Sequence, residues 1–213
     1  LLAISNIVNY DHQKIIKINL KGKNAIVTGG GRGLCKAVAL LLAKEGVNIG
    51  ITGRNEENLK STVEELKGLG IQAFYSIFSM DEETAVQNGI ANLAKDLGGI
   101  DILINNAGIG DFGSIAEMPS ETWEQVIKTN LFGVYYAAKA VYPFLKEKGE
   151  GDVVNVASTA GLKGGPNMSA YAASKAAVVS LSQSMMAEWR KENIRVITLT
   201  PSTIASDLSI QGG

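Results

Sequence analysis

Short apolar runs alternate with longer amphipathic segments along most of the chain, and this alternation restricts the possible folds more than any other feature. The apolar runs predict strands at residues 24–28, 48–52, 72–78, 101–105, 152–157 and 194–199. The segments between them predict helices at residues 34–45, 56–69, 81–97, 120–148 and about 169–191. Strands that are apolar nearly throughout are typical of a parallel sheet buried on both faces. The sequence therefore predicts an α/β fold, with a doubly wound parallel sheet between two helical layers.

The chain shows no internal boundary between domains. No change of composition and no proline- or serine-rich linker divides it, so we expect a single domain at residues 20–213. Residues 1–19 lack the basic segment with which a signal peptide begins, and we interpret them as an N-terminal arm or an appended remnant. Two local signals support the helix ends: Asn55 is placed to cap the second helix, and Gly46 follows the first helix as a C-cap glycine does.

Charge and cysteine content exclude several classes of protein. The chain has 20 basic and 21 acidic residues, a net charge of −1, so we expect no binding to nucleic acid or to an anionic membrane surface. No stretch approaches the roughly 20 apolar residues that span a bilayer. The single cysteine, Cys35, cannot form an intramolecular disulfide, which favours a reducing cytoplasm. We predict no metal site.

Glycines gather at the ends of the predicted strands. Gly29, Gly30, Gly31 and Gly33 follow the first strand, and others follow the second, fourth and fifth. Ligands of doubly wound sheets bind outside the carboxyl ends of the strands, and glycines there let backbone N–H groups approach a pyrophosphate. The generic G-x-G-x-x-G pattern fails, because Leu34 takes its third place. A purely structural strand-to-helix turn is the alternative.

Several further motifs follow in a fixed order. They are the turn that begins at Thr28-Gly29, the segment Asn105-Asn-Ala-Gly108, Asn130, Ser158, and Tyr171-Ala-Ala-Ser-Lys175. In this order and spacing the chain resembles the short-chain dehydrogenase/reductase family from about residue 20 to residue 207, and among its members most resembles the 3-oxoacyl-[acyl-carrier-protein] reductases. The resemblance implies a Rossmann fold and a catalytic set of Asn130, Ser158, Tyr171 and Lys175.

The Tyr171–Lys175 pair has chemistry of its own. Residues four apart on a helix share a face, so the phenol and the ammonium lie within reach, and a nearby cation favours the phenolate. A half-buried tyrosine beside a solvated lysine is the plainer interpretation. The resemblance implies that Tyr171 exchanges a proton with the substrate oxygen, that Lys175 lowers the pKa of Tyr171 and holds the nicotinamide ribose, and that Ser158 binds the substrate oxygen. It assigns Asn130 to a water that connects Lys175 with solvent.

The expected cofactor is NADP(H). At the end of the second strand, Gly53 stands where relatives that prefer NAD carry an aspartate, and Arg54 and Arg32 occupy the basic positions that suit a 2′-phosphate. Two solvated arginines are the alternative. The predicted cofactor-binding residues are Gly29, Gly31, Arg32, Gly33, Leu34, Arg54, Asn106, Ala107, Gly108, Tyr171, Lys175, Pro201, Ser202, Ile204 and Ser206.

The chain departs from the family pattern at a few positions. Cys35 replaces the last glycine of the turn, as either an inert buried thiol or a thiol of lowered pKa that makes cofactor binding sensitive to oxidation. Phe78 or its neighbours stand where many relatives place an aspartate near the adenine. Ser202 replaces a glycine, and Ser206 replaces a threonine. Family members run to roughly 250 residues, so we expect that the final strand is missing from these 213 residues.

These observations lead to one leading hypothesis and two alternatives. The leading hypothesis is an NADPH-dependent reductase that converts a small-molecule ketone into a secondary alcohol. The substrates considered include a 3-oxoacyl thioester linked to an acyl carrier protein. The first alternative keeps the chemistry but takes a sugar, steroid, pterin or xenobiotic ketone. The second is a non-catalytic NADP-binding scaffold. The family resemblance also implies a homo-oligomer, a tetramer or a dimer.

Overall fold

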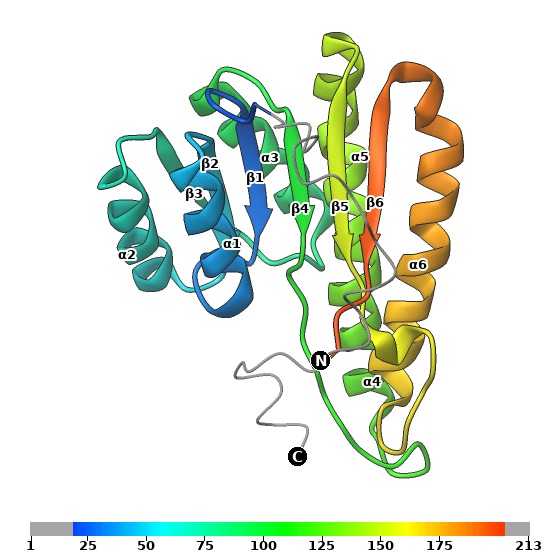
Figure 1. Ribbon diagram of the computed structural model, residues 1–213. Coiled ribbons are helices and arrows are strands. Elements are labelled where there is room, and N and C mark those ends of the chain that lie inside the picture. Colours follow the sequence, from blue (N-terminus) through cyan, green and yellow to red (C-terminus); the bar gives the residue numbers. More distant parts are fainter. Residues whose placement is uncertain (1–18, 203–213) are drawn as a thin grey trace, which may run out of the picture.

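The central element of the computed structural model is a parallel sheet of six strands (Figure 1). The structure describes residues 19–202. The strands are β1 (Asn24–Thr28), β2 (Asn48–Gly53), β3 (Ala73–Ile77), β4 (Ile102–Asn105), β5 (Gly151–Val156) and β6 (Ile194–Leu199). Their order in the sheet is β3-β2-β1-β4-β5-β6, and every neighbouring pair is parallel. The predicted doubly wound α/β sheet of the Rossmann type is confirmed.

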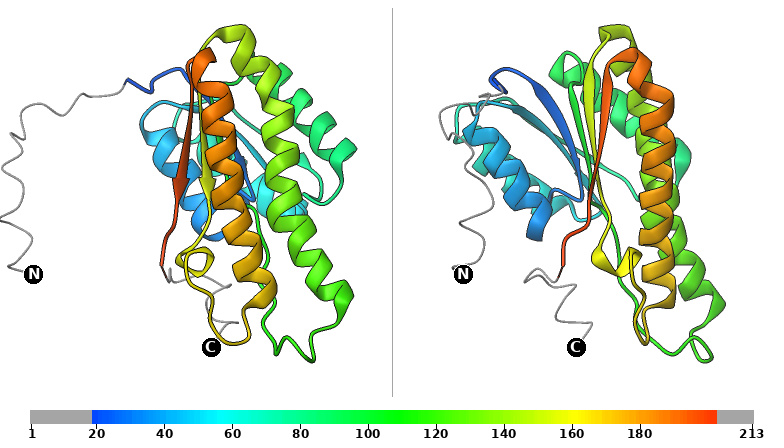
Figure 2. Two further views of the ribbon diagram at one scale, coloured as in Figure 1. Left: turned by 90° about the vertical axis from the view of Figure 1, so that its right-hand side faces the viewer. Right: turned by 45° about the vertical axis from the view of Figure 1, so that its right-hand side comes forward.

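Helices cover the sheet on both sides (Figure 2). Helices α1 (Gly33–Lys44) and α2 (Glu56–Lys67) pack on one side, and α3 (Glu83–Leu97), α5 (Gly133–Lys148) and α6 (Ser169–Trp189) pack on the other. Side chains of β1 alternate between the two cores, with Ala25 and Val27 toward α1 and Ile26 toward α3. The three-layer arrangement follows from this period of two, because each face of the sheet is apolar.

The predicted helix ends are confirmed where the signals were strongest. The Asn55 side chain accepts a hydrogen bond from the Asn58 backbone N–H at 2.8 Å and so caps α2. Gly46 follows α1 with a φ of +80°, a conformation that favours glycine. Residues 1–18 and 203–213 lie outside the described residues. The N-terminal arm and the absence of the final strand therefore stay predictions.

The segment predicted as one helix at residues 120–148 is interrupted. It consists of α4 (Ser120–Ile127), a π-helical turn at Lys128–Phe132, and α5. The π turn contains Asn130, and such turns are frequently found at functional sites. Directly after it, Gly133 lies against Met80, where an added Cβ would be 2.7 Å from the Met80 Cβ. The extra residue of the turn is invisible to hydrophobic periodicity, which is why the sequence predicted an unbroken helix.

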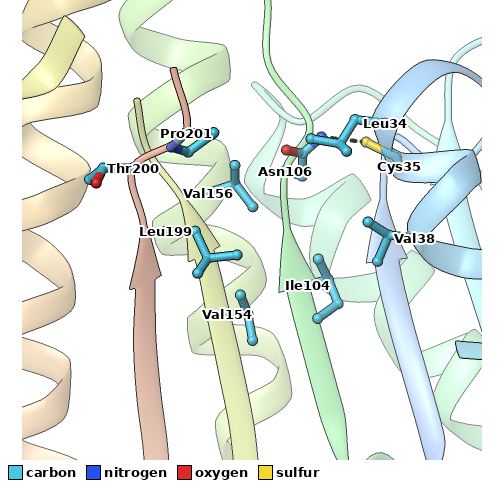
Figure 3. A pocket seen from close by; sticks show the side chains of 10 residues that line it. All are labelled: Leu34, Cys35, Val38, Ile104, Asn106, Val154, Val156, Leu199, Thr200 and Pro201. Carbon is cyan, nitrogen blue, oxygen red and sulfur yellow. Dashed lines mark hydrogen bonds between the residues drawn. The ribbon is translucent and has the colours of Figure 1, made fainter. Parts of the chain in front are cut away.

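On the α1 side, no helix within residues 19–202 covers the half of the sheet formed by β4, β5 and β6 (Figure 2). A cavity of about 600 Å³ lies there, over the carboxyl-terminal parts of these strands (Figure 3). Within residues 19–202, no helix is long and apolar enough to cross a membrane.

Candidate active site

The cavity lies at the point where the strand order of the sheet reverses, between β1 and β4. It is lined by Leu34, Cys35, Val38, Ile104, Asn106, Val154, Val156, Leu199, Thr200 and Pro201 (Figure 3). In doubly wound sheets this crevice outside the strand ends is where a dinucleotide binds. Leu34, Asn106 and Pro201, three of the predicted cofactor residues, therefore lie together at its wall.

Two glycines of the turn between β1 and α1, Gly29 and Gly30, have little or no room for a side chain. A Cβ added to Gly30 would lie 2.5 Å from the Ile51 Cγ2, and one added to Gly29 would lie 3.2 Å from the Ala107 Cα. Gly29 and Gly33 also have positive φ angles, +73° and +55°. The N-cap residue of α1 makes no capping hydrogen bond with its side chain, and the first N–H groups of a helix have no partner within the helix itself. This narrow backbone cradle fits the pyrophosphate of a dinucleotide.

Two side chains tie the end of β4 to this turn. The Thr28 hydroxyl accepts hydrogen bonds from the backbone N–H groups of Asn106 and Ala107, both at 3.1 Å, and donates to the Ile104 carbonyl at 3.3 Å. The Asn106 side chain donates to the Cys35 sulfur at 2.6 Å (Figure 3). The loop after β4 is thereby held against both β1 and α1.

Cys35 is buried, with 6% of its surface exposed. Burial raises the pKa of its thiol, and the hydrogen bond from Asn106 opposes this only in part. The hypothesis of a thiol with lowered pKa is therefore wrong, because the desolvation of a thiolate outweighs the nearby donors. The structure favours the inert buried thiol.

The four predicted catalytic residues come from three different elements. Tyr171 and Lys175 lie on α6, Ser158 follows β5, and Asn130 lies in the π turn. The Lys175 ammonium donates to the Val156 carbonyl at 2.9 Å and lies 5.7 Å from the centre of the Tyr171 ring.

The loop after β4 completes this group. A Cβ added to Gly108 would lie 3.0 Å from the Asn130 Oδ1 and 3.8 Å from the Lys175 Nζ. The structure thus brings Gly108, Asn130 and Lys175 together, as the sequence predicts.

The Asn130 carboxamide is buried and fully engaged. Its oxygen accepts from the Ile109 backbone N–H at 2.8 Å, and its nitrogen donates to the Ile109 carbonyl at 2.9 Å and to the Ser174 hydroxyl at 3.1 Å. Asn130 therefore connects the π turn, the loop after β4 and α6. Its side chain acts as a structural link at the position where the π turn approaches Lys175.

Burial changes the acid–base properties of both α6 residues. It raises the pKa of the Tyr171 phenol, and a hydrogen bond with Ser158 opposes the change. Burial also lowers the pKa of Lys175 to about 8. The expectation that Lys175 lowers the pKa of Tyr171 is not met in the protein alone, because the ammonium lies over the face of the ring and bonds to the Val156 carbonyl.

The site combines the Tyr171 phenol, the buried Lys175 and the glycine turn at one edge of the sheet, which suits the chemistry of alcohols and ketones. Comparison with known proteins identifies the family. The family model described as short chain dehydrogenase matches residues 23–211. The chain belongs to the short chain dehydrogenase family. It is therefore an oxidoreductase that acts on alcohol or carbonyl groups, in a family that binds a nicotinamide cofactor.

Curated relatives of the short chain dehydrogenase family cover most of the chain. The gluconate 5-dehydrogenase of Gluconobacter oxydans is 32% identical over 191 residues, which is 90% of this chain and 75% of that protein. The 3-oxoacyl-[acyl-carrier-protein] reductase of Thermotoga maritima is 33% identical over 192 residues, covering 90% of this chain and 78% of that protein. These two short chain dehydrogenases differ in the substrates that their names give.

Solved structures of the family are also similar. An NAD+-bound xylitol dehydrogenase superposes with a TM-score of 0.84 at 35% identity, covering 86% of this chain and 71% of that one. An actinorhodin polyketide ketoreductase with NADPH superposes with a TM-score of 0.85 at 32% identity, covering 88% and 72%. Short chain dehydrogenases of nearly equal similarity thus occur with different nicotinamide cofactors.

The other predicted residues of the short chain dehydrogenase pattern fall into three groups. Arg32 and Arg54 are exposed at the ends of β1 and β2. Phe78 is not part of the cofactor crevice: it is buried on the α3 side, where a Cβ on Gly89 would meet its ring at 2.2 Å. Ile204 and Ser206 lie outside the described residues.

Several contacts at the site were not predicted from the sequence. Ser174 holds Asn130, and Phe112 packs against Tyr171 with ring centres 5.8 Å apart. Gly161 lies so close to α6 that an added Cβ would be 2.6 Å from the Lys175 carbonyl carbon. The Gly113 N–H donates to the Asn167 carbonyl at 2.9 Å, so the loop after β4 is bonded to the loop before α6. Only the family motif itself could have pointed to Ser174, which directly precedes Lys175.

Proposed function

We propose that the protein is an NADPH-dependent ketone reductase with a substrate like a 3-oxoacyl thioester. The observation that carries the proposal is the position of the Tyr171 phenol, which hydrogen-bonds with Ser158 and whose ring centre lies 5.7 Å from the Lys175 ammonium. A phenol is protonated at neutral pH, which is the state that a proton donor in ketone reduction needs. A bound NADPH supplies the hydride.

Each residue of the site has a role in this proposal. The Ser158 hydroxyl donates a hydrogen bond to the ketone oxygen, and Tyr171 transfers its proton to that oxygen as negative charge develops there. Lys175, with a pKa of about 8, is largely protonated at pH 7 and can return a proton to Tyr171. Asn130 keeps the π turn beside Lys175, at the position where the family resemblance places a water that leads to solvent.

The cofactor would bind along the glycine turn and the loop after β4. The uncapped first turn of α1 faces the pyrophosphate, and Lys175 would hold the nicotinamide ribose. The preference for NADPH over NADH rests on Gly53, which leaves the end of β2 without a carboxylate, and on the exposed Arg54 beside it.

The proposal is tested by NADPH oxidation with a panel of 3-oxoacyl thioesters, sugar, steroid, pterin and xenobiotic ketones. The Tyr171→Phe variant removes one hydroxyl and keeps the ring against Phe112, so we expect kcat to fall by roughly 10²–10⁴-fold while NADPH still binds. The measurements are NADPH absorbance for turnover and fluorescence for binding. A variant with full activity would contradict the role of Tyr171.

The same panel separates the alternatives. Preference for a sugar ketone would favour a relative of the gluconate 5-dehydrogenase type. Binding of NADPH without turnover of any substrate would favour a non-catalytic scaffold. We further propose a homo-oligomer, because Phe132 in the π turn, Tyr135 on α5 and Met186 on α6 are 42%, 44% and 49% exposed. Light scattering measures the size of this oligomer.

A further inference from the structure

Two pairs of buried side chains, each an asparagine and a serine, connect α6 to its neighbours. Near the start of α6, Asn130 of the π turn donates to the Ser174 hydroxyl at 3.1 Å. Two turns further along, Asn155 of β5 donates to the Ser182 hydroxyl at 2.9 Å. None of the four residues exposes more than 2% of its surface. We call them the Asn–Ser pairs.

The two pairs have the same chemistry. Each serine donates its own proton to a carbonyl of α6, Ser174 to Tyr171 and Ser182 to Val178, both at 2.7 Å. The hydroxyl oxygen is then oriented to accept from the asparagine amide. Each serine therefore links the backbone of α6 to an element outside the helix.

The pair at Ser182 continues across the sheet. The Asn155 side-chain oxygen accepts from the Asn105 amide at 3.0 Å, and Asn105 ends β4 beside Asn155 in register. Asn155 directly precedes Val156, whose carbonyl holds Lys175, and lies three residues before Ser158. Strand β5 therefore carries the hydrogen bond to α6 and the Val156 carbonyl that holds Lys175, and it leads directly to Ser158.

The spacing of the pairs matters for α6. Ser174 and Ser182 are eight residues apart, about 12 Å along a helix that rises 1.5 Å per residue. Apolar contacts tolerate small displacements of a helix along its axis, whereas hydrogen bonds depend on distance and direction. Two such bonds at different heights restrict both the translation and the tilt of α6.

We propose that Ser174 and Ser182 are positioning residues that fix α6 against the π turn and the sheet, so that Tyr171 and Lys175 meet Ser158 and the Val156 carbonyl. The inference rests on the proposed function, since it assigns the two serines to the geometry of proton transfer. Replacing a hydrogen-bonded pair by apolar groups of similar shape can leave stability nearly unchanged, so burial of four polar side chains points to a demand for geometry.

The test compares Ser182→Ala and Ser174→Ala with Ser184→Ala. Ser184 is an exposed residue of the same helix, whose hydroxyl donates to the Ser180 carbonyl at 3.4 Å and to no element outside the helix within residues 19–202, so it is a matched control. We expect kcat for ketone reduction to fall about tenfold in each buried variant, with KM for NADPH changed less than twofold, because displacement of about 1 Å is costly for a reacting pair. Ser184→Ala should behave as the wild type. Ser182→Thr, which keeps a hydroxyl, should recover part of the rate, and Ser182→Cys should not.

A second readout does not depend on turnover. The Ser158 hydrogen bond lowers the pKa of Tyr171, so a displaced α6 should raise that pKa further. The phenolate absorbance of Tyr171, taken as the difference between each serine variant and the same variant carrying Tyr171→Phe, should titrate at higher pH than in the wild type. The high-pH limit of kcat should move in the same direction.

The possible outcomes separate the two proposals. If the wild type reduces no ketone, the proposed function fails, and the phenolate titration still tests the positioning role. If Ser174→Ala, Ser182→Ala and Ser182→Cys lower only the melting temperature, with kcat per folded molecule and the Tyr171 titration equal to those of Ser184→Ala, the serines are structural and the inference is overturned.

Discussion

Lys175 exposes only 5% of its surface, so its ammonium is costly to keep charged in the folded protein. Its one hydrogen-bond acceptor among the described residues is the neutral Val156 carbonyl. Burial accordingly lowers the pKa of Lys175 from 10.5 to about 8. Without cofactor, this lysine is therefore a source of pH-dependent stability.

The Lys175→Met variant measures that dependence. Between about pH 8 and pH 10.5 the unfolded chain binds more protons at residue 175 than the folded protein does, so the stability of the wild type should rise with pH. Relative to Lys175→Met, the free energy of unfolding should increase by up to about 3 kcal/mol across this window. Urea denaturation of the cofactor-free proteins near both ends of the window provides the values. If the free energy of unfolding depended on pH equally in the two proteins, folding would not lower the pKa of Lys175.

Cofactor preference is also decided at single residues. Gly53 ends β2, and a Cβ added there would lie 3.4 Å from the Leu59 Cδ2, which is an ordinary contact. A side chain can therefore be introduced without strain. We expect Gly53→Asp to shift the ratio of NADPH to NADH affinity roughly tenfold or more toward NADH, since its carboxylate repels a 2′-phosphate and accepts from ribose hydroxyls.

The matched control for this change is Gly53→Asn, which has the same size without the charge. It should keep most of the wild-type preference in fluorescence titrations with the two cofactors. The same ratio in the aspartate variant and the wild type would show that residue 53 does not face the ribose.

Among single residues, the sequence predicts the candidate site residues but not their hydrogen-bond partners. The helix period puts Tyr171 and Lys175 on one face of a helix, and the family resemblance adds Ser158 to their predicted site. The bonds Asn106–Cys35 and Asn130–Ser174 join residues 71 and 44 positions apart. Such contacts depend on the packing of whole elements, which no local pattern encodes.

Among the elements, the segment from α4 to α5 differs most from its prediction. The amphipathic pattern is continuous over residues 120–148, whereas the structure inserts the π turn that carries Asn130. The turn is stabilised by contacts outside it, the bonds of Asn130 to Ile109 and the approach of Gly133 to Met80. The strands are predicted more accurately, because a buried parallel strand is apolar along its whole length.

The Gly133→Ala variant tests the close approach at this element. An added Cβ would lie 2.7 Å from the Met80 Cβ and 2.9 Å from the Met80 carbonyl oxygen, so the helix must move. We expect a loss of about 1–3 kcal/mol in the free energy of unfolding, measured by chemical denaturation. Gly164→Ala is a suitable control, since its nearest neighbour would be the Ala172 Cβ at 3.8 Å. A variant at residue 133 as stable as this control would argue against the tight contact.

In the whole molecule, the two halves of the sheet contribute different parts of the candidate site. The half with β1 to β3 contains the glycine turn between β1 and α1, whereas the half with β4 to β6 is flanked by α6, which carries Tyr171 and Lys175 (Figure 1). A dinucleotide that binds in the crevice between the halves contacts both. Its binding should therefore stabilise the folded protein as a unit.

Thermal unfolding measures this linkage. At a concentration of NADP+ about 100 times its dissociation constant, the stabilisation is about 2.7 kcal/mol, or a rise in Tm of roughly 5–10 °C for a domain of this size. NAD+ at the same concentration should give a smaller rise. Equal shifts with both nucleotides would contradict the proposed preference for NADP.

The hydrogen bond between Gly113 and Asn167 joins two loops that are more than fifty residues apart in the chain. One of these loops carries Phe112, which packs on Tyr171, and the other leads into α6. For protein engineering, this makes the pair of loops the unit of exchange. A single transplanted loop of different length or conformation would displace one backbone group of this bond, so a change of substrate by loop grafting calls for both loops to be exchanged together.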